Sequence, residues 1–226
     1  MPARGVLYIK WGDKFEDLLN RSIESVKKVH PELPIHVETL PETSTLLDKS
    51  KMARITPFEE TLFLDADTVV LDDLTYGFEK AQTFGLALAI CECPWARRYT
   101  GLKSSGDLIE YNTGVIFFTR AATNLFDRWQ SLAASLDSSV LHMQDGKLCR
   151  MPENDQAGLA SAVDETGFCP FVLPMNWNLR PGWHHSFFGT IKIWHSPNPI
   201  IPSLLEWNAQ QSKPGALVQF ATINYT

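Results

Sequence analysis

The sequence predicts an α/β protein with a mostly parallel, Rossmann-like central sheet and helices on both of its faces. Three observations support this class: a strand, a helix and a strand open the chain, a wholly apolar third strand follows, and further strands alternate with helices. The chain has 226 residues, 44% of them hydrophobic. That is enough for one sizeable core, so we expect a single domain over residues 1–226.

The opening of the chain gives the clearest local signals. A short run of strand-forming residues is followed by apolar residues at steps of three and four, which is typical of an amphipathic helix. Two prolines then end the helix before a second strand-like run. These segments are the strand Val6–Ile9, the helix Phe15–Val29 and the strand Ile35–Glu38.

The third strand, Thr61–Leu64, suits a central strand buried on both faces. Alternating elements continue after it without an internal repeat. The segment Cys91–Asp107 has no clear period and is predicted to be a loop, with a candidate role as a lid. The later elements are the strands Val69–Leu71, Leu86–Ile90, Val115–Phe118 and Ile191–Trp194, and the helices Asn124–Leu136 and Asp155–Val163.

The composition argues against several classes of protein. A formal net charge of −6 disfavours a nucleic-acid binder, because such proteins neutralise phosphates with clustered basic residues. No apolar run approaches the roughly 20 residues that a membrane-spanning helix needs, and no signal peptide precedes the first strand. The four cysteines lack the paired spacing of a zinc site, so we expect free, mostly buried thiols and a cytoplasmic location.

Two carboxylates after the third strand give the strongest functional signal. Asp65 and Asp67 are two residues apart, which in an extended segment puts both side chains on one side of the chain. Ligands of open α/β sheets bind at this end of the strands. Close carboxylates repel each other unless a cation lies between them, and their oxygens suit Mg²⁺ or Mn²⁺. The alternative is an Asp-rich turn that continues into Asp72 and Asp73.

The segment Lys51–Leu74 resembles the donor-site segment of GT-A glycosyltransferases, and it is most similar to the family 8 type, which includes glycogenin. The resemblance spans residues 5 to about 197 and implies the GT-A fold. It also implies transfer of a sugar from a nucleotide-diphosphate donor, expected to be a UDP-sugar, to a carbohydrate or glycoconjugate acceptor. The donor-binding half would cover about 1–110 and the acceptor-side half about 111–226.

The resemblance also assigns roles to single residues. Asp65, Asp67 and a late His195 match the ligands of a Mn²⁺ (or Mg²⁺) ion. Asp155 and Gln156 match an Asp-Gln segment beneath the reacting carbon, which makes them the expected catalytic residues and implies retention of configuration. The expected donor-binding residues are Tyr8, Asp13, Lys51, Arg54, Ala66, Asn112 and Gly114.

Three positions depart from the family pattern. After His195 the family has Gly and then a Lys that contacts the diphosphate, whereas this chain continues Ser-Pro-Asn-Pro. Ala53 stands where Tyr is common, and Ala157 stands where a second carboxylate is expected. Candidate replacements for the missing lysine are Lys192, Lys51 and Arg54.

Alternatives remain at the level of residues and of function. His195 could be a buried structural histidine, Asp155 a helix cap and Arg54 a surface arginine. A catalytically silent protein of the same fold would also explain the lost positions. A sugar nucleotidyltransferase would need a Gly-rich basic loop after the first strand, where this chain has only Gly12. A metal-dependent hydrolase would need a His-rich pattern that the chain lacks.

Overall fold

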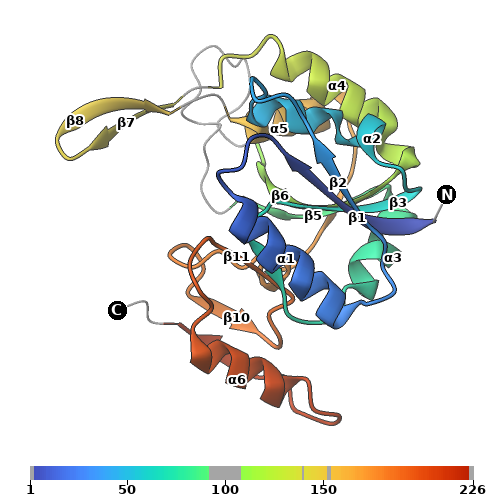
Figure 1. The fold of residues 1–226 in the computed structure, drawn as a ribbon, viewed down its shortest axis with the longest axis vertical. Helices are drawn as coiled ribbons and strands as arrows, with labels where there is room; N and C mark the ends of the chain where they lie inside the picture. Colours follow the sequence, from blue (N-terminus) through green and yellow to red (C-terminus); the bar gives the residue numbers. More distant parts are fainter. Residues whose placement is uncertain (1–2, 92–107, 139, 152–153, 224–226) are drawn as a thin grey trace.

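The computed structural model of the chain describes residues 3–91, 108–138, 140–151 and 154–223 (Figure 1). It confirms the predicted class: a six-stranded sheet has the order β2-β1-β3-β6-β5-β9, and β6 alone runs against the other five. The described strands are β1 (Arg4–Lys10), β2 (Ile35–Thr39), β3 (Glu60–Leu64), β4 (Thr68–Val70), β5 (Leu86–Ile90), β6 (Tyr111–Thr119), β7 (Val140–Gln144), β8 (Lys147–Met151), β9 (Phe171–Val172), β10 (Ser186–Phe188), β11 (Ile193–His195) and β12 (Phe220–Thr222).

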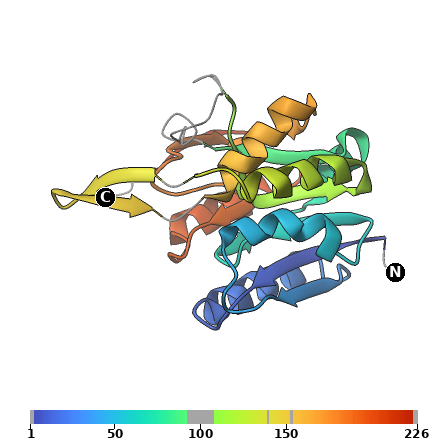
Figure 2. The same cartoon turned by 90° about the horizontal axis from the view of Figure 1, so that it is seen from above.

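Helices cover both faces of this sheet. The helices α2, α4 and α5 pack on one face and α1 and α3 on the other (Figure 1), and α4 runs beside α5 (Figure 2). The described helices are α1 (Glu16–Val29), α2 (Met52–Ile55), α3 (Thr75–Phe84), α4 (Thr123–Ala133), α5 (Asp155–Thr166) and α6 (Pro202–Gln211), with the short 3-10 helices η1 (Leu46–Lys51), η3 (Arg120–Ala122) and η4 (Met175–Trp177).

The strand β3 shows why the sheet is apolar on both faces. Leu62 and Leu64 point into the core beneath α1 and α3, whereas Phe63 points into the core beneath α2, α4 and α5. All three side chains are at most 1% exposed. A strand whose successive side chains enter two different cores must be apolar throughout, as the sequence predicts.

A second, two-stranded sheet lies next to the turn that holds Asp65 and Asp67. The strand β4 pairs antiparallel with β11, and the register places Thr68 opposite His195 and Val69 opposite Trp194. The hydroxyl of Thr68 donates to the backbone oxygen of Asp65 at 2.8 Å, which closes the turn between β3 and β4. This pairing brings the end of β11 next to the acidic turn, although the two segments lie far apart in the sequence.

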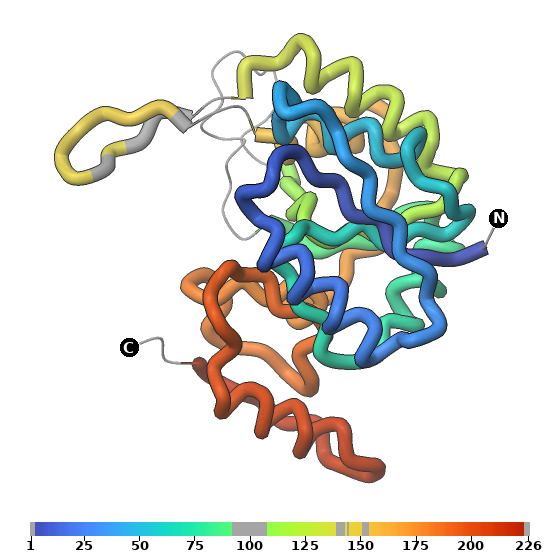
Figure 3. Tube along the Cα trace, in the orientation of Figure 1, coloured from blue at the N-terminus to red at the C-terminus, as the bar shows by residue number. Residues whose placement is uncertain are grey.

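Most predicted elements are present, with ends that differ by at most four residues. The prediction missed the helices α2, α3 and α6, the 3-10 helices, the short strands β9, β10 and β12, and the hairpin β7–β8. This hairpin stands away from the body of the molecule (Figure 3). Apart from Cys91, the candidate lid Cys91–Asp107 lies outside the described residues. Of the described thiols, only Cys91 is buried, while Cys149 and Cys169 are free and more exposed than expected. None of the helices in the described ranges is long and apolar enough to cross a membrane.

Candidate metal and donor site

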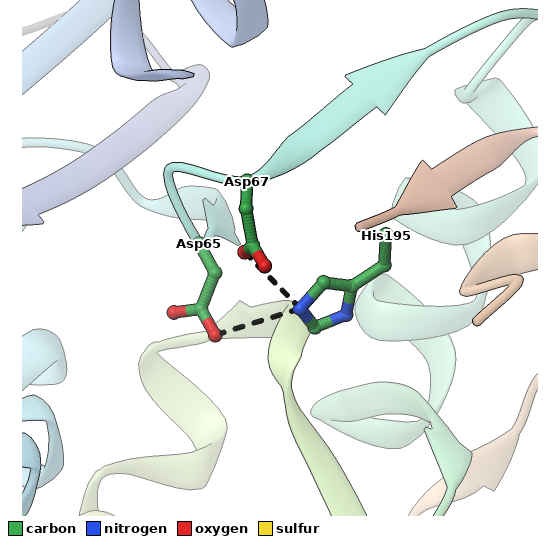
Figure 4. A group of neighbouring side chains, drawn as sticks. All are labelled: Asp65, Asp67 and His195. Carbon is green, nitrogen blue, oxygen red and sulfur yellow. Dashed lines mark ion pairs between the residues drawn. The ribbon is translucent and has the colours of Figure 1, made fainter. Parts of the chain in front are cut away.

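Three potential metal ligands converge where β3, β4 and β11 meet (Figure 4). Nε2 of His195 lies 3.3 Å from Oδ1 of Asp67 and 3.9 Å from Oδ2 of Asp65. One ligand atom from each residue lies within 4.8 Å of the others. The predicted trio is therefore brought together by the β4–β11 register, and both carboxylates point toward the imidazole.

The absence of a side chain at Gly114 makes this convergence possible. Gly114 lies on β6, and its backbone oxygen accepts a hydrogen bond from the backbone N–H of Asp65 at 2.8 Å. A Cβ atom built at this position would lie 2.2 Å from Cε1 of His195 and 2.8 Å from Oδ2 of Asp65. Any larger residue here would displace the ring or the carboxylate.

A buried lysine that the sequence analysis missed completes the charged centre. Nζ of Lys49, from η1, lies 2.9 Å from Oδ1 of Asp65 and 3.0 Å from Oδ2 of Asp155. The residue is only 3% exposed. Burial lowers the pKa of this amine, but the carboxylates of Asp155 and Asp65 outweigh that effect and raise the net pKa above its ordinary value. Lys49 is therefore a permanent cation that links the metal-ligand cluster to the Asp-Gln segment.

The two predicted ligand carboxyls are shifted in opposite directions. Burial raises the pKa of Asp65, and the nearby charges of Lys49 and His195 only partly oppose it. For Asp67, the effect of burial is outweighed by the hydrogen bond and charge of His195, so its pKa is lowered. Asp67 is thus the more strongly stabilised carboxylate of the pair.

Asp155 and Gln156 form the first turn of α5, close to Lys49. The helix is capped by Asn154, whose side chain accepts the backbone N–H of Gln156 at 2.7 Å, so capping does not explain Asp155. The Asp155 carboxylate instead accepts a hydrogen bond from Thr113 Oγ1 at 2.7 Å. Its backbone oxygen accepts the indole N–H of Trp129 at 3.0 Å. Asp155 is held on three sides and is 5% exposed.

A cleft of about 250 Å³ opens beside the acidic turn. Its far wall is formed by the loop that connects β1 to α1, where Trp11 and Phe15 supply aromatic surface and Phe15 is 55% exposed. The cleft is lined by Ile9, Lys10, Trp11, Gly12, Phe15, Glu16, Leu18, Leu19, Leu46, Lys49, Asp65, Ala66, Asp67 and Pro197. Of the predicted donor-binding residues, Ala66 lines this cleft, and the exposed Asp13 lies in the same loop as its aromatic wall.

The structure does not place Tyr8 where a ligand could reach it, which corrects the sequence prediction. Tyr8 is 1% exposed, and its hydroxyl is hydrogen-bonded to Ser22 at 2.8 Å inside the core beneath α1. Burial raises the pKa of this hydroxyl. Strand alternation points Tyr8 toward α1, so the strand residues beside the cleft are Ile9 and Lys10.

The predicted basic residues are also engaged elsewhere. Arg54 lies on the surface and pairs with Asp127 at 2.7 Å rather than with the acidic pair. Lys51 pairs with Asp48 at 2.5 Å, and Lys192 pairs with Asp72 at 2.8 Å. Among the described residues, Lys49 lies beside the carboxylates, where the family resemblance had assigned Arg54.

Asn112 is buried close to the cluster rather than open to the cleft. Its side-chain oxygen accepts the backbone N–H of Gly114 at 2.9 Å and the amide of Asn178 at 2.9 Å. Asn178 in turn lies 2.7 Å from Nδ1 of His195. The sequence analysis did not select Asn178, because nothing local in the segment after η4 marks it as a neighbour of His195.

The fold and the position of the cluster define a protein with the GT-A glycosyltransferase fold. No protein-family model matches the chain, and no curated protein matches its sequence. Solved structures do match. Mouse xyloside xylosyltransferase 1 in its apo form superposes with a TM-score of 0.58 at 15% identity, covering 87% of this chain and 99% of that one.

Two further glycosyltransferase structures agree with this result. The galactosyltransferase LgtC, in complex with donor and acceptor sugar analogues, gives a TM-score of 0.56 at 14% identity over 94% of this chain and 92% of its own. The glycosyltransferase GlyE of Streptococcus pneumoniae TIGR4 gives 0.51 at 14% identity, over 80% of this chain and 47% of its own. At these identities the similarity establishes the fold.

Proposed function

We propose that the protein is a metal-dependent glycosyltransferase that moves a sugar from a nucleotide-diphosphate donor, expected to be a UDP-sugar, to a carbohydrate or glycoconjugate acceptor. The proposal rests on one observation: Asp65, Asp67 and His195 converge beside a cleft with aromatic walls. The donor and acceptor sugar analogues named for the LgtC structure support this choice of ligands.

The residues of the cluster fit a divalent cation. Carboxylate oxygens with one imidazole nitrogen are a suitable ligand set for Mn²⁺, and three protein ligands leave positions for diphosphate oxygens. The charge balance points the same way. Leaving His195 aside, the carboxylates of Asp65, Asp67 and Asp155 and the ammonium of Lys49 sum to a formal charge of −2, which a divalent cation would cancel.

Each group in the site has its own role in the proposed transfer. A bound cation would supply positive charge to the leaving diphosphate. The protonated amine of Lys49 adds a second positive charge beside the cation site. The exposed ring of Phe15 offers a face on which a nucleobase can stack. Cleavage gives the sugar carbon oxocarbenium character, and we assign its stabilisation to Asp155, with Gln156 beside it. Because Asp155 and Gln156 match the Asp-Gln segment of the family they resemble, we propose that transfer retains configuration.

Calorimetry with UDP, with and without Mn²⁺, tests this function. We expect UDP binding that requires Mn²⁺ in the wild type and is lost in Asp67→Asn, because that variant removes one ligand charge. Asp72→Asn is the matched control, since Asp72 pairs with Lys192 away from the cluster. Equal UDP affinity without metal, or an Asp67→Asn variant that binds like the wild type, would contradict the proposal.

A binding protein of the same fold that lacks transferase activity is the second candidate. The observation that favours it is the engagement of Lys192, Lys51 and Arg54 in ion pairs elsewhere, which leaves the family's diphosphate lysine without any of its predicted replacements. Release of UDP from a panel of UDP-sugars separates the two. Metal-dependent UDP binding with no release from any sugar, with or without acceptors, would favour the binding protein.

A further inference from the structure

We infer that Asn178 is a positioning residue that sets the tautomer of His195 through a hydrogen-bond chain anchored on the backbone of β6. The inference rests on the proposed metal site, because it concerns which nitrogen of His195 is available there. The chain runs from Gly114 through Asn112 and Asn178 to His195, with lengths of 2.9, 2.9 and 2.7 Å.

The direction of every hydrogen bond in the chain follows from its first member. The backbone N–H of Gly114 can only donate, so the Asn112 atom that faces it is the carboxamide oxygen. That same oxygen faces Asn178, so Asn178 must present its NH₂ group there and its oxygen to the imidazole. An oxygen that only accepts requires a proton on Nδ1 of His195.

The consequence for the neutral imidazole is a lone pair on Nε2. This is the nitrogen that faces Asp67 at 3.3 Å and Asp65 at 3.9 Å. Metal-bound histidines commonly donate their other N–H to such a partner, which fixes the ring and its tautomer. Without Asn178 the opposite tautomer would place a proton where the ligand electrons are needed.

Burial makes this chain of hydrogen bonds rigid. Asn112 is 4% exposed and Asn178 is 1% exposed. Reversing either carboxamide would set two N–H groups, or two oxygens, against each other inside the protein, and an unpaired buried polar group costs about 1–3 kcal/mol. Asn112 therefore acts on the cluster through Asn178, in addition to the sugar-binding role that the sequence predicts for it.

Long-range ¹H–¹⁵N NMR of the His195 ring in metal-free protein, at a pH where the ring is neutral, tests the inference directly. The wild type should show the Nδ1–H form. Asn178→Leu has no oxygen to accept the Nδ1 proton and should shift the ring toward the Nε2–H form. Asn176→Ala is the control, because Asn176 donates to the backbone oxygen of Thr190 at 2.6 Å in the same segment. An Nε2–H ring in the wild type would overturn the inference, even if the leucine variant fails to fold.

Affinity for Mn²⁺ in the presence of UDP gives an independent readout. We expect Asn178→Leu to weaken it by about 10- to 100-fold, with Asn176→Ala staying within about twofold. Unchanged affinity in Asn178→Leu would contradict the positioning role. Absence of Mn²⁺ binding in the wild type would refute the proposed metal site instead, while the ring tautomer still decides whether Asn178 acts on His195.

Discussion

Replacement of Gly114 by alanine tests the packing argument for the site. The added methyl would lie 2.2 Å from Cε1 of His195 and 2.8 Å from Oδ2 of Asp65. An ordinary carbon–carbon contact is about 3.5 Å, so the ring must retreat by about 1.3 Å. Metal–ligand distances tolerate only about 0.2 Å. We expect Mn²⁺-dependent UDP binding to fall by at least about 100-fold, although only one methyl group is added.

The control separates loss of the site from loss of the fold. Gly77→Ala places its methyl 2.5 Å from Cζ of Phe117, in the core and away from the cluster. Overpacking costs about 1–3 kcal/mol in either variant, which lowers Tm by roughly 2–12 °C for a chain of this size. Calorimetry should show lost binding only in Gly114→Ala, with similar Tm values in both. Wild-type affinity in Gly114→Ala would refute the reasoning.

Three other substitutions test the charged centre and the cleft. Lys49→Met should destabilise the fold by about 3–5 kcal/mol, because it leaves two carboxylates without their buried partner; Lys51→Met, at an exposed pair, should cost at most about 1 kcal/mol by thermal unfolding. Arg54→Ala should leave UDP affinity unchanged, since its partner is Asp127, and a clear loss would restore the donor-site role. Phe15→Ala should weaken UDP binding by about 1–3 kcal/mol without changing Tm, as expected for a stacking ring. Unaltered affinity would show that the nucleobase of UDP does not stack on Phe15.

The elements with a strong period were predictable, and those without one were not. The helix α1 carries a clear apolar stripe and β3 a wholly apolar run, so both were identified from the sequence. The helix α3 has a weak stripe and begins where the Asp73 carboxylate accepts the N–H of Thr75, a local contact that resembles a turn. The hairpin β7–β8 turns at Asp145 and Gly146, both at positive φ, but the described apolar side chains on its strands, Met143 and Leu148, are exposed.

Within the site, sequence reasoning succeeded where chemistry is local and failed where it depends on register. The acidic pair stands within three residues, so its spacing marked it as a candidate metal site, with an Asp-rich turn as the alternative. His195 could be selected because it ends an apolar strand, while its contact with Asp67 depends on the β4–β11 pairing. Tyr8 was assigned to the wrong face, because a β-rich run does not reveal which of its alternate residues faces the helix.

Lys49, the basic partner of the acidic pair, could not be selected without knowing the helical structure of the segment around it. Lys49, Lys51 and Arg54 all precede the pair, and composition cannot distinguish them. In a helix Lys51 lies about 200° around the axis from Lys49, and Arg54 about 140°, so neither of them can face inward together with Lys49. Met52 and Ala53 follow Lys49 by three and four residues, share its face, and are buried with it. Helical structure over residues 46–55 would therefore have predicted Lys49 as the inward cation, and a lysine is buried in this way when carboxylates lie within reach.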